Sequence, residues 1–328
     1  MSRLQPLCYH PRMSSSSPVL AVDLGGTAFR VALVDADGRI VRRVRRPTLP
    51  EQGADAVIAR IVEAAREVAG DDAPAALGVA APGPLDPFTG VVLYASTLGW
   101  TDVPLRARLA EALGLPTVLH NDANLAALGE QRFGAACGFR DMAYVTLSTG
   151  IGCGVILGDR LVLGARGLAT ELGNHSVSFD SSVDHFGLPG ALEALAAGPA
   201  IAAAAQRRLA DGESSIMRAL AGGRIEDVTA REVGLAAAQG DAAAAAIVRH
   251  AARVIGIGMV NLLHLFDPAI VVIGGSVALM GDVLWQPLRA VVRECAMPPY
   301  REIPFVPAQL GDDSGLLGAA AAAIIGLP

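Results

Sequence analysis

Residues 20–40 read LAVDLGGTAFRVALVDADGRI, in which two runs of β-favouring residues flank the turn Gly25-Gly26-Thr27. An aspartate, Asp23, lies inside the first apolar run. A buried carboxylate is costly unless it has a partner. Either another group of the protein pairs with Asp23, or its partner is a metal-bound phosphate beside the turn, because the backbone N–H groups of glycine turns are open to anions.

The chain contains no lysine, so all 26 of its basic residues are arginine. The Walker P-loop and the protein-kinase fold both hold phosphates with a lysine. These two nucleotide-binding designs are therefore excluded. Any phosphate chemistry must depend on backbone N–H groups and on metal-binding carboxylates.

The composition is that of a globular protein, with 52% hydrophobic and 18% charged residues among 328. A net charge of -6 argues against nucleic-acid or anionic-membrane partners and favours a small-molecule ligand. No apolar stretch reaches about 18 residues without a glycine, proline or charge, so we expect no membrane association.

The four cysteines lie far apart and include no C-x-x-C pair, which fits a reducing cytoplasm. Residues 1–17 lack the apolar core of a signal peptide, and we expect them to form a disordered N-terminal tail. We therefore expect a cytoplasmic protein, with Met1 and Met13 both open as its start.

Strand-like runs at 19–24, 29–34 and 77–81 alternate with helical stretches at about 54–69, 104–113 and 123–133, which predicts an α/β fold. A second hairpin at 143–163 repeats the strand, glycine turn and strand of the first. This repetition suggests duplicated halves, although a glycine between strands often marks only a tight turn. A third element, AIVVIGGSVALM at 269–280, is a buried-type strand that ends in Gly274-Gly275.

Three glycine turns at strand ends, without lysine, resemble the nucleotide site of the actin, Hsp70 and sugar-kinase superfamily. More closely, the chain from about residue 18 onward resembles the ROK family of bacterial sugar kinases. Five further segments carry this resemblance in the family's order: APGPLDPFTG (81–90), STLGW (96–100), HNDANLAALGE (120–130), ATELGNHSV (169–177) and GALEALAAGPA (190–200).

The resemblance implies a two-domain actin-like ATPase fold, of the duplicated ribonuclease H-like type, with a cleft between the domains. We expect a small α/β domain at 18–122, completed by the C-terminal helix at about 315–328, and a large α/β domain at 123–314. Relatives usually form dimers, so we also expect a homodimer.

By the same resemblance, Asp122 is the general base that takes the proton from the 6-hydroxyl of the sugar. In isolation an Asn-Asp pair after a strand is more simply a helix N-cap. The resemblance implies that the sugar is bound by Thr97, Asn121, Asp122, Glu171, Asn174 and Glu193.

The resemblance also implies ATP and Mg²⁺ as cofactors. Asp23 would face the metal, directly or through water. The nucleotide and its phosphates would contact Asp23, Gly25, Gly26, Thr27, Thr149, Gly150, Gly152, Gly274 and Gly275.

This sequence departs from the family where most members hold a structural zinc with one histidine and three cysteines. Asn174 replaces the histidine, and no cysteine remains in the segment SSVDHFGLPGALE that follows. We expect no structural zinc. His175, Asp184 and His185 include no compact ligand pair before the turn, so we interpret them as surface residues rather than as a substitute metal site. Thr97 and Ala28 stand where many relatives have asparagine and lysine.

The predicted activity is ATP-dependent phosphorylation of the 6-hydroxyl of a hexose, with glucose as the first choice from family frequency. N-acetylmannosamine, N-acetylglucosamine and fructose remain open as acceptors. An alternative of another class is a sugar-binding ROK regulator without kinase activity. Such regulators carry an N-terminal winged helix-turn-helix, whereas about 17 polar residues precede the first predicted strand here.

Overall fold

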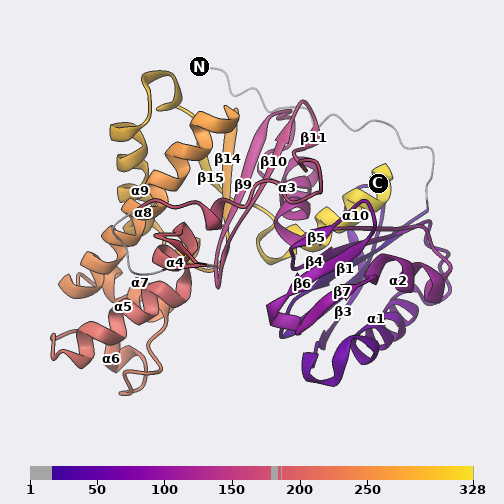
Figure 1. Ribbon diagram of the computed structural model, residues 1–328, viewed down its shortest axis with the longest axis horizontal. Coiled ribbons are helices and arrows are strands. Elements are labelled where there is room, and N and C mark those ends of the chain that lie inside the picture. The colour runs from indigo at the N-terminus through magenta and orange to yellow at the C-terminus, as the bar shows by residue number, and fades with distance from the viewer. Residues whose placement is uncertain (1–16, 179–183, 186, 328) are drawn as a thin grey trace. The chain divides into compact units, whose positions relative to one another are not determined.

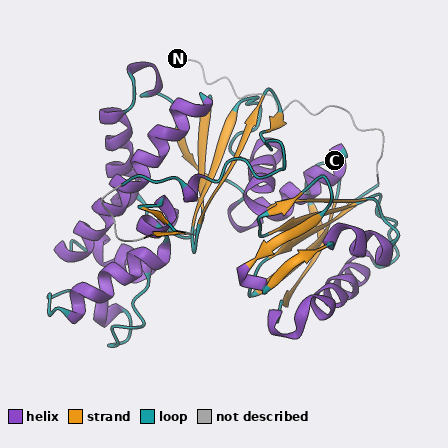
Figure 2. Cartoon of the chain, viewed as in Figure 1, coloured by secondary structure: helices purple, strands orange, loops and turns teal. Residues whose placement is uncertain are grey.

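A computed structural model describes residues 17–178, 184–185 and 187–327, so the predicted tail lies almost wholly outside the described residues. The chain divides into two compact units. The first comprises the described residues up to Tyr144 together with 154–170 and those from Ala308 onward, and the second comprises 145–153 and the described part of 171–307. The domain boundaries expected from the sequence stay a prediction. Figures 1 and 2 show the elements of each unit.

The first unit is built on a five-stranded sheet in the order β3-β2-β1-β4-β8. Its first three strands are antiparallel neighbours, while β1, β4 and β8 run parallel. Their bounds are β1 Val19–Leu24, β2 Ala28–Val34, β3 Ile40–Pro47, β4 Leu77–Ala81 and β8 Thr117–Asn121. The predicted strands at 19–24 and 77–81 are confirmed, and β2 begins one residue earlier than predicted.

Helices cover this sheet where its strands are buried, as in β1 and β4, whereas β3 is largely exposed and carries four arginines. Helix α1 (Gly53–Ala69) buries Val57, Ile61 and Val68 in the core formed with Val22 and other strand residues. Helix α10 (Ser314–Ile325) packs on β1 and β4. Its approach is close, since a Cβ atom on Gly78 of β4 would lie 1.8 Å from the Ala319 carbonyl oxygen. Helix α2 (Leu105–Leu113) buries Leu105 and Leu109 beside β8.

Helix α3 (Asp122–Phe133) follows β8 directly and is fixed to the chain before α10 by one buried carboxylate. Glu130 is 0% exposed and accepts hydrogen bonds from Ser314 Oγ at 2.8 Å and from the backbone N–H groups of Ala135, Gln309 and Leu310 at 2.8, 3.1 and 2.9 Å. Four donors satisfy a buried charge that would otherwise be costly. Residues 309–314 are thereby held against α3.

A small three-stranded sheet, β5-β6-β7, lies in the same unit and carries Thr97 in the short helix η2 (Ser96–Leu98). Its strands are β5 Leu85–Asp86, β6 Val91–Ala95 and β7 Trp100–Val103. The first unit also contains three short segments: η1 Pro50–Gln52, β11 Arg160–Leu161 and η6 Gly311–Asp313.

A second five-stranded sheet has the order β11-β10-β9-β14-β15. The predicted second hairpin is confirmed as β9 and β10, and the strand predicted near 269–274 is confirmed as β14. The bounds are β9 Met142–Leu147, β10 Ile151–Leu157, β14 Ile270–Gly274 and β15 Phe305–Pro307.

The second unit is otherwise mainly helical. Its alanine-rich sequence forms several helices. Their bounds are α4 Leu192–Ala196, α5 Gly198–Ala210, α6 Met217–Leu220, α7 Ala230–Ala238, α8 Ala242–Phe266 and α9 Asp282–Cys295, with η3 Leu172–Asn174, β12 Asp184–His185, β13 Leu188–Pro189, η4 Ala278–Met280 and η5 Pro298–Tyr300 between them.

Helix α8 is the one described helix that is long and apolar enough, by length and composition, to cross a membrane. The expectation from the sequence concerned stretches free of glycine, proline and charge, and α8 contains Arg249, Arg253 and Gly256. In addition, 61% of its most apolar window is buried inside the protein, where α8 packs against α7 and α9. A buried core helix passes the same test, so this single helix is weak evidence for a membrane protein.

Candidate active site

The first turn, Gly25–Thr27, closes the β1–β2 hairpin and is held in place by a buried threonine. Thr48 donates from Oγ1 to the Gly25 carbonyl at 2.6 Å and from its backbone N–H to the Thr27 carbonyl at 2.9 Å. Within the described chain, the N–H groups of Gly26 and Thr27 donate to no backbone or side-chain oxygen. The turn can therefore offer these N–H groups to an anion.

Asp23 has a protein partner, which the sequence interpretation did not identify. Arg30 is its direct cross-strand neighbour in the β1–β2 register, and the two side chains form an ion pair. The side chains are 17% and 26% exposed. Burial raises the pKa of the Asp23 carboxyl above its ordinary value, and the Arg30 charge opposes that rise. The protein thus supplies the compensation that a carboxylate in an apolar strand requires.

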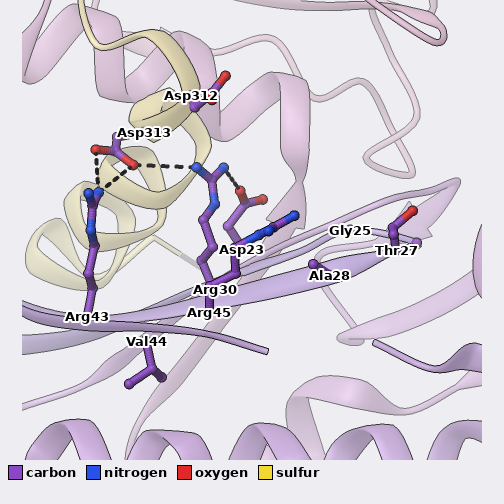
Figure 3. A pocket seen from close by; sticks show the side chains of 11 residues that line it. Asp23, Gly25, Thr27, Ala28, Arg30, Arg43, Val44, Arg45, Asp312 and Asp313 are labelled. Carbon is purple, nitrogen blue, oxygen red and sulfur yellow. Dashed lines mark hydrogen bonds and ion pairs between the residues drawn. The ribbon is translucent and has the colours of Figure 1, made fainter. Parts of the chain in front are cut away.

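A cavity of about 1070 Å³ opens beside the first turn. Arg30 also reaches Asp313 at 3.4 Å, and Arg43 reaches the same carboxylate at 3.0 Å (Figure 3). The cavity therefore combines backbone N–H groups with charges of both signs. Its lining residues are Asp23, Gly25, Gly26, Thr27, Ala28, Arg30, Arg43, Val44, Arg45, Asp312 and Asp313.

The cavity suits a magnesium ion that arrives with phosphate. Mg²⁺ is usually held by one or two carboxylates plus phosphate oxygens and water. Asp23, Asp312 and Asp313 supply carboxylates of that kind. In the part of the chain that the structure describes, no three His, Cys, Asp or Glu side chains cluster as a metal site by themselves. A metal here would therefore take part of its coordination from the phosphates.

Asn121 and Asp122 lie at the end of β8 and the start of α3. Asn121 caps the helix, because its Oδ1 accepts hydrogen bonds from the backbone N–H groups of Ala123 at 2.9 Å and Asn124 at 3.4 Å. The N-cap interpretation of this pair is thus confirmed for Asn121. Asp122 follows as an exposed residue in the first helical turn. A helix N-terminus stabilises a carboxylate in its ionised form.

The predicted residues of the first unit lie along one edge of its main sheet. Strands β1, β4 and β8 are parallel, so their carboxyl ends meet at the same edge. Asp23 lies near that end of β1, and Asn121 ends β8. Thr97 packs against the first turn, since a Cβ on Gly26 would lie 2.8 Å from the Thr97 Cβ.

The second turn, Ser148–Gly150, is supported by a carboxylate. Glu193 at the start of α4 accepts a hydrogen bond from the Ile151 N–H at 2.7 Å. A Cβ on Gly150 would lie 2.6 Å from Glu193 Oε2, so only glycine allows this approach. Thr149 is exposed, and Gly152 lies in β10 next to the turn.

The third turn, Gly274–Gly275, lies beside the second turn. Gly275 has φ +88°, and a Cβ there would lie 2.3 Å from the Leu147 carbonyl oxygen. Ser276 Oγ is 3.2 Å from Ser148 Oγ. The structure therefore brings together these two of the predicted nucleotide-binding segments.

Glu171 and Asn174 lie at the start and end of η3, and Asn174 Nδ2 donates to Glu171 Oε2 at 3.1 Å. Gly173, between them, approaches the Ile151 carbonyl so closely that a Cβ would lie 2.3 Å away. The three predicted sugar-binding residues of the second unit, Glu171, Asn174 and Glu193, thus gather around the second turn. Their contacts with a sugar stay a prediction.

The predicted absence of zinc also stays a prediction. His175 is partly buried, while the side chains of Asp184 and His185 lie outside what the structure describes.

Comparison with known proteins adds three findings. The model of the ROK family matches residues 19–325. A glucokinase from Thermotoga maritima is 38% identical over 92% of this chain and 96% of its own length. A putative xylose repressor from a Caldicellulosiruptor strain is 32% identical over 76% of this chain and 62% of its own length.

Among solved structures, a ROK family glucokinase from Streptomyces griseus in complex with glucose and AMPPNP superposes with a TM-score of 0.81. It is 34% identical, and the match covers 94% of this chain and 99% of that one. The two-domain actin-like sugar-kinase fold predicted from the sequence is thereby confirmed.

Proposed function

Because this chain belongs to the ROK family, we propose that it transfers the terminal phosphoryl group of ATP to the 6-hydroxyl of glucose. The match to glucokinases extends over nearly the whole chain. The single observation that supports the chemistry best is the exposed Asp122 carboxylate, which starts a capped helix at the sheet edge where the first turn lies.

Phosphoryl transfer needs an aligned hydroxyl, a proton acceptor and neutralisation of the phosphate charge. Asp122 accepts the proton of the 6-hydroxyl. Its first-turn position on α3 and the Asn121 cap fix the carboxylate relative to the sheet edge. Mg²⁺, when bound, neutralises charge on the phosphates, and Asp23 with Asp312 or Asp313 would hold it.

Within this proposal the phosphates are assigned to the N–H groups of the first turn and to Thr149, Gly150 and Gly152. Gly274 and Gly275 are assigned to the adenosine, and a side chain on Gly275 would clash with Leu147. These assignments rest on the open N–H groups of the first turn and on the close approach of the third turn to the second.

The sugar hydroxyls are bound by Thr97, Asn121, Glu171, Asn174 and Glu193. A carboxylate has about four lone-pair sites, so Glu193 can accept from Ile151 and from a sugar hydroxyl together. The amide of Asn174 can donate and accept. N-acetylmannosamine, N-acetylglucosamine and fructose are the alternative acceptors within this proposal.

We also propose a homodimer and a Mg²⁺ requirement from the resemblance, a cytoplasmic location from the spacing of the cysteines, and the absence of structural zinc from the missing zinc ligands. Elemental analysis of purified protein checks the last point. One tightly bound zinc per chain would contradict it.

The second candidate function is a sugar-binding regulator, because the chain also matches a putative xylose repressor over 76% of its length. A coupled ADP-release assay with glucose, mannose, fructose and both N-acetylhexosamines separates the two. The proposal expects ADP release that depends on ATP, Mg²⁺ and a hexose. Sugar binding without any ADP release would favour the regulator.

A further inference from the structure

Three residues of the first unit form a row of charges across neighbouring strands. Asp23 of β1 is paired with Arg30 of β2, and Arg30 is paired in register with Arg45 of β3. Residues directly opposite one another across strands present their side chains to the same face of the sheet. All three line the cavity beside the first turn (Figure 3).

This row is not electrically balanced. Like charges directly opposite each other on neighbouring strands are destabilising. Arg30 is compensated by Asp23 and Asp313, and Arg43 by Asp313. Arg45 forms no ion pair or side-chain hydrogen bond within residues 17–178, 184–185 and 187–327. Its charge therefore adds to that of Arg30.

The remaining carboxylate of the cavity does not compensate Arg45. Asp312 lines the cavity but makes no ion pair within the described chain. In Figure 3 its side chain points away from the three arginines. An arginine that is left without an anion, beside a turn with open N–H groups, is a site for an anionic ligand.

The other arginines of β3 show that this arrangement is specific to one face. Arg42 and Arg46 alternate with Arg43 and Arg45 along the strand, and both have protein partners. Arg42 pairs with Asp72, and Arg46 pairs with Glu67 at 2.7 Å. The strand thus neutralises its arginines on one face and leaves Arg45 available on the face of the first turn.

We propose that Arg45 binds the terminal phosphates of the phosphoryl donor, together with the Gly26 and Thr27 N–H groups. This inference rests on the proposed function, in which ATP is the donor. A guanidinium matches two phosphate oxygens at once and is always charged, so it can replace the lysine that this chain lacks. Glucose, being uncharged, gains nothing from it.

The test is steady-state kinetics of Arg45→Ala with ATP and glucose varied separately. We expect the KM for ATP to rise roughly ten- to hundredfold, the effect of losing a charge-assisted contact to phosphate, with the KM for glucose changed less than about twofold. Arg45→Lys should recover part of the loss, because an ammonium keeps the charge but not the paired geometry. The matched control is Arg46→Ala, which removes an exposed arginine from the opposite face of the same strand.

Calorimetric titration of the full chain with ATP and with inorganic tripolyphosphate separates this inference from the kinase proposal. We expect Arg45→Ala to weaken both ligands and Arg46→Ala to weaken neither. If the wild type binds ATP but phosphorylates no hexose, the kinase proposal fails while loss of binding in Arg45→Ala still supports this inference. If the wild type is a kinase and Arg45→Ala binds both ligands as tightly as Arg46→Ala does, the inference is overturned.

Discussion

The first and second glycine turns each join two neighbouring strands of a sheet, but different charged side chains lie beside them. The first turn borders a cavity with Arg30 and Arg45 on its strands. The second turn is supported by the Glu193 carboxylate, which accepts from Ile151 N–H at 2.7 Å. An arginine favours phosphate, whereas a carboxylate favours hydroxyl groups. We therefore infer that Arg45 adds a phosphate contact beside the first turn. Glu193 adds a sugar contact beside the second turn, whose own residues Thr149 and Gly150 are proposed to contact the phosphates.

If both turns only hold ligands, the chemistry must depend on a residue outside them. Asp122→Asn keeps the size of the side chain but cannot accept a proton. We expect kcat to fall about 10²–10⁴-fold, the usual loss for a general base, with the dissociation constant for glucose within a few-fold of the wild type. A coupled ADP-release assay measures kcat, and calorimetric titration measures the dissociation constant for glucose.

The control is Asp72→Asn, an exposed aspartate of the same unit that pairs with Arg42. We expect near-wild-type turnover from it. Near-wild-type turnover from Asp122→Asn instead would remove Asp122 from the role of base.

Selectivity between sugars tests the residues beside the second turn. Asn174 replaces a histidine of the family, and its amide reaches Glu171 at 3.1 Å. The Asn174 amide can still donate and accept a hydrogen bond. We therefore expect the proposed sugar-binding residues Glu171, Asn174 and Glu193 to discriminate weakly between sugars that differ at carbon 2. We expect kcat/KM for glucose and mannose to differ by less than about a hundredfold. A preference for glucose over mannose beyond a thousandfold, or activity on N-acetylated sugars alone, would contradict this description of the sugar-binding residues.

Glu193→Gln tests whether the carboxylate of the second turn acts on the sugar side. The amide can accept from Ile151, but it lacks the charge that makes such hydrogen bonds roughly twice as strong. We expect kcat/KM for glucose and mannose to fall together by roughly tenfold, with the KM for ATP nearly unchanged. Glu226→Gln, at an exposed ion pair of the same unit, is the control. An equally large rise in the KM for ATP would contradict a role for Glu193 in sugar binding alone.

The smallest effect is expected for the pH dependence of the folding stability, through the Asp23 carboxyl beside the first turn. Burial raises the pKa of Asp23 in the folded protein, so the ionised carboxylate costs stability above that pKa, and the cost disappears as pH falls towards about 3.9, the unfolded value. The wild type should therefore gain stability relative to Asp23→Asn as pH is lowered from 7 towards about 3.9. One proton limits the slope to about 1.4 kcal/mol per pH unit. Denaturant unfolding measures it, and a relative loss of wild-type stability on acidification would show that the pKa is lowered instead.

The pattern of the sequence was sufficient to predict the strands that end in the three glycine turns and the helix α3, but not the short helices η2, η3 and α4 that carry other candidate residues. The α/β alternation, the glycine turns and the Asn121 cap depend on local residues, and all are found in the structure. The pairing of Asp23 with Arg30 was also within reach. In a hairpin that closes with Gly25 bonded to Ala28, residues at equal distances from the turn face each other, and these two do.

The position of Arg45 could not be predicted in the same way. The β2–β3 register shifts between Leu33 and Val34, so counting from the turn gives the wrong partner for every residue beyond that irregularity. Glu130 is a second example. In the sequence it is an ordinary helix glutamate. Its burial depends on hydrogen-bond donors at 309–314, which lie far away in the sequence.

The central claim is that the exposed carboxylate of Asp122 activates the 6-hydroxyl of a hexose for attack on ATP. Phosphorus and carbon NMR of a reaction containing ATP, Mg²⁺ and glucose labelled with carbon-13 at position 6 tests it most directly. We expect a single phosphomonoester whose phosphorus is coupled to the labelled carbon, formed in step with ADP by the wild type and about 10²–10⁴-fold more slowly by Asp122→Asn. Phosphate on another carbon of the sugar, or no phosphorylated sugar from the wild type, would contradict this role of Asp122.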